Sequence, residues 1–199
     1  MTISSYFTCL VLVLFCWLQS ASGQSSHRFS LGPQAGISRT TITGEYAVTW
    51  QKNYLLGFVF RFEVKENFAV GLEANYERKG INSGHTPLGT GVTFTINEYF
   101  DYLSNNALYE YSFREAGGFY LQSGVYFAYL LGKKNESQSD LNKPLDFGIL
   151  FRIGYLFSFK RGGDVRLYLG KAHGLISVDE DGDSNKNRAF MACVQVLIQ

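Results

Sequence analysis

Residues 145–159 read LDFGILFRIGYLFSF, and along this stretch two kinds of side chain alternate. One set of alternate positions is apolar throughout: Leu145, Phe147, Ile149, Phe151, Ile153, Tyr155, Phe157 and Phe159. The positions between them include Asp146, Gly148, Arg152, Gly154 and Ser158. Because successive residues of a β-strand point to opposite faces, this period of two predicts a strand with one apolar face and one face rich in small and charged residues.

The same alternation recurs along the chain. Apolar residues share one face in residues 54–63, 68–77, 119–131 and 190–198. The chain is therefore expected to be all-β, with eight strands separated by turns and polar stretches. We place these strands at roughly residues 28–38, 54–63, 68–79, 94–113, 119–132, 145–159, 165–178 and 188–198.

The segments between these strands follow a long-short rhythm. Short charged turns lie at residues 65–67, 114–118 and 160–164, and long polar stretches lie near residues 39–53, 80–93, 133–144 and 179–187. A membrane-spanning barrel sorts its connections in this way, with short turns on the periplasmic side and long loops outside. The rhythm predicts an eight-stranded antiparallel up-and-down transmembrane β-barrel, with both termini on the periplasmic side.

The composition of the two faces predicts which one meets lipid. An eight-stranded barrel encloses little more than side-chain volume, so small and polar residues belong inside and bulky apolar residues outside. By this parity the inward glycines include Gly32, Gly36, Gly57, Gly71, Gly124, Gly148 and Gly154. Two aromatic girdles are expected: Phe62, Phe68, Phe113, Phe119, Phe157 and Phe159 near the short turns, and Trp50, Tyr54, Tyr76, Tyr99 and Tyr129 near the long loops.

Two segments deviate from the pattern. Alternation is weak over residues 99–108, which predicts a bulge or an irregular stretch. Simple parity would also point Lys171 and His173 into lipid, where a charge near the midplane costs about 2–4 kcal/mol. We therefore expect a bulge near Gly170 that turns both side chains inward.

The N-terminus has the pattern of an export signal. Residues 9–18 form a short apolar core, and Ala21-Ser22-Gly23 supplies the small residues at which a signal peptidase cleaves. We expect a signal peptide over residues 1–23 and a mature barrel domain over residues 24–199. Cys193 is then the one cysteine left, which excludes an intramolecular disulfide.

Composition excludes several classes of function. The net charge of +1 provides no basic field for nucleic acid. The sequence contains no phosphate-binding loop, zinc-ligand spacing or dinucleotide fingerprint, so we expect neither an enzyme nor a bound cofactor. Outer-membrane lipid is the expected partner, with a protein or small ligand possible at the external loops and a monomer favoured.

The inward face carries a set of charges that forms the main candidate site. These residues are Arg61, Glu63, Glu73, Glu77, Asp146, Arg152, Lys160 and Arg166. A three-residue turn at 65–67 sets Arg61 diagonal to Glu73, within reach of long side chains. Because isolated buried charges are heavily penalised, the charges are expected to pair. A salt-bridge plug that fills the lumen is the favoured interpretation, and a polar gate or small pore is the alternative.

A second candidate lies in the last long stretch. Asp179, Asp181, Asp183 and Asn185 place oxygen ligands at every second residue, as calcium-binding loops do. An EF-hand requires Gly at its sixth position and a bidentate Glu at its twelfth, whereas this chain has Ser184 and Phe190 there. The favoured interpretation is therefore a solvated external loop, with cation binding as the alternative.

Several short motifs resemble a known family. They are Gly118-Phe119-Tyr120-Leu121-Gln122-Ser123-Gly124, Tyr129-Leu130-Leu131-Gly132, Leu145-Asp146-Phe147-Gly148-Ile149-Leu150 and Gly154-Tyr155. Together they resemble the outer-membrane β-barrel domain family that includes the PorT-like proteins of Bacteroidota. The resemblance implies an eight-stranded outer-membrane barrel, and a few members of that family assist protein secretion. This chain departs from the family pattern at residues 102–106 and lacks a terminal aromatic, because it ends in Gln199.

Three functions remain open from the sequence. The leading hypothesis is a non-enzymatic integral outer-membrane barrel with a structural or interaction role at its external loops. A narrow pore or a PorT-like secretion accessory is the second. The third is a soluble exported barrel that binds an apolar ligand as lipocalins do, which would require the apolar faces to point inward.

Overall fold

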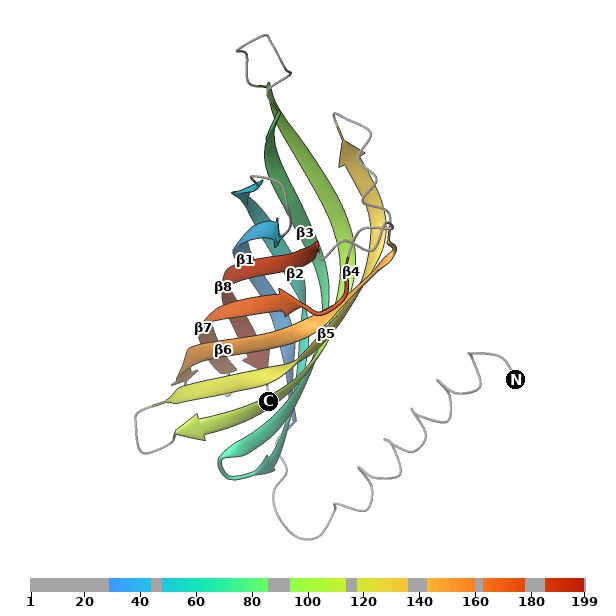
Figure 1. The fold of residues 1–199 in the computed structure, drawn as a ribbon. Coiled ribbons are helices and arrows are strands. Elements are labelled where there is room, and N and C mark those ends of the chain that lie inside the picture. Colours follow the sequence, from blue (N-terminus) through green and yellow to red (C-terminus); the bar gives the residue numbers. More distant parts are fainter. Residues whose placement is uncertain are drawn as a thin grey trace, which may run out of the picture.

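Eight antiparallel strands close into a single barrel in the computed structural model, which describes residues 29–43, 48–85, 94–113, 118–135, 143–159, 163–177 and 185–198 (Figure 1). The strands are β1 (Phe29–Thr43), β2 (Val48–Lys65), β3 (Phe68–His85), β4 (Phe94–Phe113), β5 (Phe119–Asn135), β6 (Leu145–Phe159), β7 (Gly163–Gly174) and β8 (Lys186–Ile198). The predicted fold class and strand number are confirmed. Among the described residues no helix is long and apolar enough to cross a membrane.

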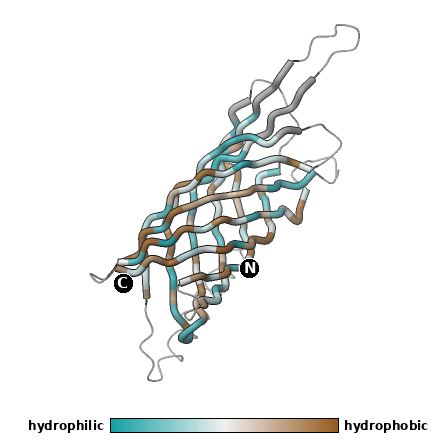
Figure 2. Tube along the Cα trace, turned by 90° about the vertical axis from the view of Figure 1, so that its left-hand side faces the viewer, coloured by the Kyte–Doolittle hydropathy of each residue, from teal (hydrophilic) through white to brown (hydrophobic). Residues whose placement is uncertain are grey.

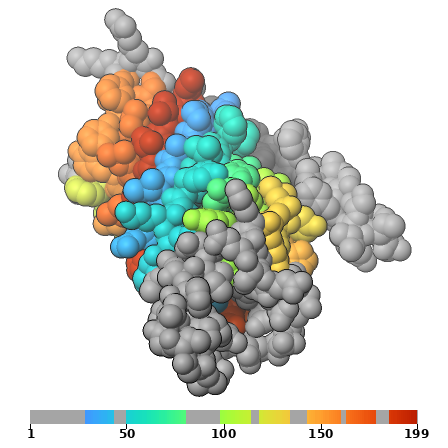
Figure 3. All heavy atoms as spheres, turned by 90° about the horizontal axis from the view of Figure 1, so that it is seen from above, coloured from blue at the N-terminus to red at the C-terminus, as the bar shows by residue number. Residues whose placement is uncertain are grey.

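The barrel closes where the first strand pairs with the last. β1 is antiparallel to β8 from Leu31 opposite Ile198 to Thr43 opposite Lys186, and each other strand pairs with its neighbours in sequence. Viewed from above in Figure 3, blue β1 lies between red β8 and cyan β2. Closure removes the free sheet edges, so that the backbone polar groups of the strands are satisfied without water.

The two faces of each strand are oriented as the parity predicts. Phe58 and Phe151 are each 58% exposed on the outside, whereas Glu73 and Arg152 are each 3% exposed inside. Hydropathy therefore alternates along the tube in Figure 2. Phe127, on β5, also points outward. The apolar side chains thus cover the outer wall of the barrel, which is the arrangement that a lipid environment favours.

Several strands run further than the sequence pattern predicts. Residues 39–53 were expected to form a long loop, but β1 continues to Thr43 and β2 begins at Val48. The backbone pairing of β1 with β2 continues there, and inward polar side chains bond between the two neighbouring strands: the Asn53 amide donates to the Thr40 hydroxyl at 2.7 Å. β3 likewise continues to His85, while β7 ends at Gly174, four residues before its predicted end.

The irregularity expected over residues 99–108 is confined to one point. Asp101 pairs with Gly132 but Tyr102 pairs with Leu130, so one extra residue, Leu131, is accommodated in β5. From Tyr102 onward the register of β4 with β5 is unbroken. The bulge is therefore located where the alternation weakens, and β4 itself is continuous.

The bulge expected near Gly170 is absent, and that prediction is wrong. β7 keeps an unbroken register with both β6 and β8 through Gly170, and the Lys171 side chain is exposed on the outer wall. Lys171 lies three residues from the long-loop end of β7, with its Nζ 5.5 Å from the centre of the Phe190 ring. A long, flexible side chain near the membrane interface can place its ammonium group in the polar region, which is less costly than distorting the strand.

Aromatic side chains contact one another at both ends of the barrel wall. Near the short turns the pairs are Phe68 with Tyr111, Tyr111 with Phe113, Phe119 with Tyr155 and Tyr155 with Phe157, at centroid distances of 4.7–5.0 Å. Near the long loops Trp50 packs on Phe190 at 5.2 Å and Tyr54 on Tyr76 at 6.1 Å. Amphipathic rings at two levels are what the interfaces of a bilayer favour.

Candidate functional site

The lumen holds a network of charged and polar side chains in three layers, which we call the lumen network. Each layer is centred on one carboxylate: Glu110 near the short turns, Glu73 midway and Asp146 near the long loops. All three residues are buried, at 3% exposure or less. The alternation of each strand turns these residues inward, and the closed wall then brings together side chains from strands that are not neighbours.

The lower layer joins β4 to strands on both sides of the barrel. The Glu110 carboxylate accepts hydrogen bonds from Arg61 Nε at 3.1 Å and from Gln122 Nε2 at 2.8 Å, and it pairs with Arg166. Arg61 also contacts Glu63 at 2.8 Å. The Arg166 guanidinium lies over the Tyr120 ring at 3.9 Å, within the range of a cation–π contact.

The middle layer is a bidentate ion pair across the lumen. Arg152 Nη1 and Nη2 of β6 lie 2.6 Å and 2.9 Å from the two carboxylate oxygens of Glu73 on β3. Asn106 donates to the same carboxylate at 2.7 Å and Gln195 at 3.1 Å. The guanidinium also stacks over Tyr168 at 4.3 Å. Parallel N–H···O bonds of this kind fix geometry as well as contributing energy.

The upper layer is built around Asp146, the second residue of β6. Its carboxylate accepts bonds from Lys79 Nζ at 2.7 Å, from Asn187 at 2.8 Å and from the Tyr126 hydroxyl at 3.1 Å. Lys79 also lies 3.8 Å from Glu77. The Lys79 ammonium group lies between the Asp146 carboxylate and the rings of Tyr102 and Tyr126, whose centroids are 5.0 Å and 4.6 Å away.

Two inward tyrosines fill the remaining volume because glycines face them. Tyr120 and Tyr126 on β5 pair directly with Gly154 and Gly148 on β6. A Cβ atom added at either glycine would overlap the facing ring. These glycines therefore leave the space that the buried aromatic side chains occupy.

We expect Gly154→Ala to lower the free energy of unfolding by about 1–3 kcal/mol, because the new methyl group forces Tyr120 out of its site. Urea unfolding in lipid vesicles, followed by tryptophan fluorescence, measures this change. Gly132→Ala is the matched control, since a Cβ there would meet no atom within 4 Å. Adding Tyr120→Leu to Gly154→Ala should recover only part of the stability, because the new Cβ still lies 2.6 Å from the Leu167 carbonyl oxygen. Equal losses in both glycine variants would contradict the packing argument.

The structure brings some of the sequence-predicted charges together and separates others. Arg61 does lie diagonal to Glu73 in the β2–β3 register, but each makes its ion pair elsewhere. Glu73 meets Arg152, Glu63 meets Arg61, and Glu77 lies near Lys79. Arg166 reaches Glu110. Lys160 lies outside the described residues.

Sequence reasoning missed two charged members of this network. Glu110 was overlooked because it lies next to the weakly alternating stretch, although outward Tyr109 and Phe113 set its parity. Lys79 continues the inward parity of Glu73 and Glu77, so the same alternation could have identified it. Their partners could not be read from the sequence, because they depend on which strands face each other across the closed barrel.

The candidate cation site cannot be placed. Asp179, Asp181 and Asp183 lie outside the described residues, while Asn185 is buried just before β8. Within the described part of the chain no three His, Cys, Asp or Glu side chains are grouped so that they could hold a metal ion. Cation binding by this stretch stays a prediction.

The model of a protein family described as "Outer membrane protein beta-barrel domain" matches residues 18–180. Among solved structures, OprG of Pseudomonas aeruginosa is similar, with 13% identity, 89% of this chain and 97% of that chain covered, and a TM-score of 0.54. No curated protein matches the chain.

Two further solved structures are similar at lower TM-scores. Ail of Yersinia pestis, in complex with the heparin analogue sucrose octasulfate, has 13% identity, 86% and 99% coverage and a TM-score of 0.45. Outer membrane protein W of E. coli has 16% identity, 89% and 100% coverage and a TM-score of 0.43.

Proposed function

Because the chain belongs to the outer membrane protein beta-barrel domain family and is an outer-membrane β-barrel, we propose that it acts as a closed, non-enzymatic barrel whose external end meets a ligand or partner. The lumen network carries this proposal. Its three layers connect strands that are not neighbours in the barrel. The ion pairs are Glu110 with Arg61 and Arg166, Glu73 with Arg152, and Asp146 with Lys79. Eight strands enclose little more than the volume of such side chains.

The bonding of these carboxylates supports a structural role over a catalytic one. Glu73 accepts two hydrogen bonds from Arg152 and further bonds from Asn106 and Gln195, and Glu110 is bonded by two arginines. The oxygens of both carboxylates are therefore already occupied by donors from the protein. A general acid or base requires a group that can exchange a proton with a substrate within reach.

The external end is the surface left for recognition. β3 and β4 stay paired from Gly80 opposite Tyr99 to His85 opposite Phe94, and this hairpin rises above the other strands in Figure 1. Strands that project beyond the membrane present loops to solvent on a rigid base, which suits binding. The long-loop end is therefore the expected site of contact with a ligand or partner.

The alternatives differ in how far the structure supports them. The lipocalin-like barrel is not favoured, because the apolar side chains cover the outer wall while polar ones fill the interior. A narrow pore would require a continuous path past three layers of ion pairs. The PorT-like secretion role and the assignment to Bacteroidota stay predictions; loss of secreted proteins on deletion of the gene would test the former.

We expect the purified barrel to give no stepwise conductance in planar lipid bilayers, with a general porin in the same membrane as the positive control. Arg152→Ala should also stay closed, because the Glu110 and Asp146 layers still block the lumen. Stepwise conductance by the unmodified barrel would contradict the closed-barrel proposal and favour the pore.

An epitope inserted at residues 136–142 and stained on intact cells tests whether the long-loop end is external.

A further inference from the structure

Four cationic side chains lie together on the outer wall near the long-loop end. Lys52, Arg39, Arg188 and Lys171 come from β2, β1, β8 and β7, and all four are exposed. We call them the basic patch. Arg39 pairs directly with Lys52 on one side and with Phe190 on the other, and Phe190 pairs with Lys171. Since neighbouring strands are about 4.8 Å apart, three of the charges fall within roughly 15 Å along one row.

The patch differs from Arg78, another outward cation of the upper wall. Arg78 on β3 is neutralised by Asp101, directly opposite on β4, at 2.7 Å. Among the described residues no such ion pair neutralises the basic patch: β1 and β8 include no Asp or Glu, Asp164 of β7 is buried inside, and Glu63 of β2 pairs with Arg61 near the short turns. The patch concentrates positive charge on a part of the outer wall that is otherwise mainly apolar, with exposed Ile37 and Leu169 beside it.

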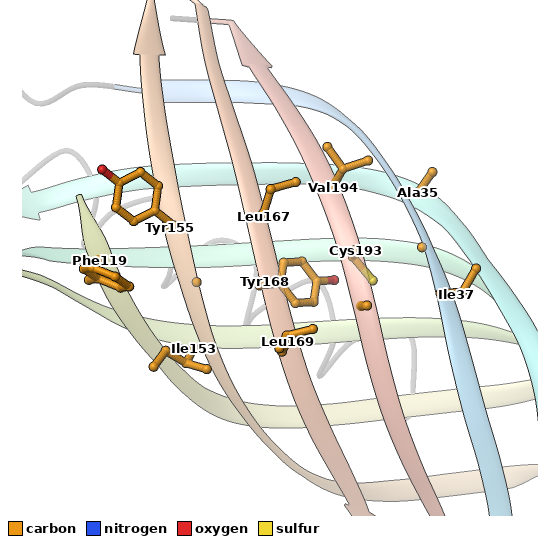
Figure 4. Close-up of a pocket in the computed structure, with 13 residues that line it drawn as sticks. Ala35, Ile37, Phe119, Ile153, Tyr155, Leu167, Tyr168, Leu169, Cys193 and Val194 are labelled. Carbon is orange, nitrogen blue, oxygen red and sulfur yellow. The ribbon is translucent and has the colours of Figure 1, made fainter. Parts of the chain in front are cut away.

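An apolar groove continues from the patch toward the middle of the wall. Its upper part, of about 560 Å³, is lined by Ile37, Arg39, Lys52, Leu169, Phe190 and Ala192. Its lower part, of about 820 Å³, shares Ile37, Leu169 and Ala192. It continues to Ala35 and Val194, and it extends sideways to Ile153, which pairs with Leu169 (Figure 4). The groove exists because Ala35 and Ala192 are small while Ile37, Ile153 and Leu169 stand above them.

We propose that the basic patch and this groove bind one phosphate-bearing lipid of the outer leaflet. The phosphate oxygens accept hydrogen bonds from Arg39, Lys52 and Lys171, and an acyl chain lies along the groove. Arginine presents a planar fork of donors that suits phosphate, and cations at a membrane surface attract anionic headgroups. The outward cations near the membrane interface are thereby matched with charge of the opposite sign.

The basic patch and the groove together favour a lipid over a second copy of this chain as the bound molecule. A second copy of the chain docking through the same face would bring two basic patches together, and like charges repel. A soluble phosphate would use the cations but leave the groove unused. One molecule with phosphate at its head and hydrocarbon below occupies both surfaces in the order in which they lie on the wall.

The proposal is tested by titrating the protein, purified from outer membranes in a non-ionic detergent, with diphosphorylated lipid A and counting bound lipid by native mass spectrometry. We expect saturable binding of lipid A and none of phosphatidylcholine. Each cation removed should weaken binding about fivefold, so that the Arg39→Gln/Lys171→Gln variant binds about 25-fold more weakly. Arg78→Gln, which removes a cation from the other wall, should bind as the unmodified protein does.

Two further experiments test whether lipid A binding depends on the groove as well as on the cations. Ala192→Trp fills the groove and should weaken lipid A binding while leaving the cations in place. Inorganic phosphate should fail to compete at concentrations that saturate free phosphate sites. Equal weakening by Arg78→Gln and by the double variant, binding unchanged in Ala192→Trp, or full competition by inorganic phosphate would each overturn the proposal.

Discussion

Replacing Glu73 by alanine is expected to lower the free energy of unfolding by about 3–5 kcal/mol, because the change leaves Arg152 as a buried cation without its partner. Arg152 is 3% exposed and its guanidinium lies over the Tyr168 ring, so it cannot reach water without disturbing the lumen. Asn106 and Gln195 lose their acceptor at the same time. Urea unfolding of the barrel in lipid vesicles, followed by tryptophan fluorescence, measures the loss.

Two variants separate the charge effect from a general loss of packing. Glu73→Leu combined with Arg152→Met removes both charges, and replacing a buried ion pair with apolar side chains is often neutral or stabilising. That double variant should be far more stable than Glu73→Ala. Asp101→Ala breaks the partly exposed pair with Arg78 and should cost about 0–1 kcal/mol. If Glu73→Ala cost no more than Asp101→Ala, the middle layer would not be a buried ion pair in the folded barrel.

The period of two was enough to predict which face of each strand meets lipid. It holds because a closed wall has one inside and one outside, and each residue must suit one of them. The strand ends were predicted less well, since Thr40 and Gln51 look like loop residues yet lie in paired strands. Beyond the lipid no apolar face is required, so strand pairing can continue through polar sequence without leaving an apolar alternation.

The ion-pair partners within the lumen could not be predicted from the sequence for a different reason. Neighbouring strands give local diagonals such as Arg61 and Glu73, which the turn length sets correctly. The pairs that form, Arg61 with Glu110 and Glu73 with Arg152, join strands that are not neighbours. Such contacts depend on the tilt and stagger of the whole barrel, which no single hairpin specifies.

The prediction of a bulge that turns Lys171 inward was wrong because it applied the energetic cost of a charge at the membrane midplane to a residue near the interface. A lysine on the lipid-facing wall costs about 2–4 kcal/mol at the midplane but about 0–1 kcal/mol near the headgroups. Lys171 is close to the end of a short strand, so the lower value applies and no bulge is required. The same depth dependence makes a second large effect predictable.

Phe58→Arg is expected to lower the free energy of unfolding in lipid vesicles by about 2–4 kcal/mol. Phe58 lies midway along β2 between the aromatic levels marked by Phe62 and Tyr54, and its side chain is 58% exposed on the outer wall. A guanidinium there meets acyl chains, and it is too far from either interface to reach the headgroups without cost. Reversible urea unfolding in vesicles gives the value.

The control introduces an arginine at a different depth in the membrane. Tyr129 is outward on β5 and belongs to the upper aromatic level, so Tyr129→Arg should cost about 0–1 kcal/mol. In detergent micelles, which adapt to a charged side chain by local rearrangement, the difference between the two variants should shrink. A soluble barrel would show no such difference, because an arginine on a water-facing wall is tolerated equally at both positions. Equal stability of Phe58→Arg and Tyr129→Arg in vesicles would therefore contradict the orientation on which the membrane-facing wall, the basic patch and the lumen network all depend.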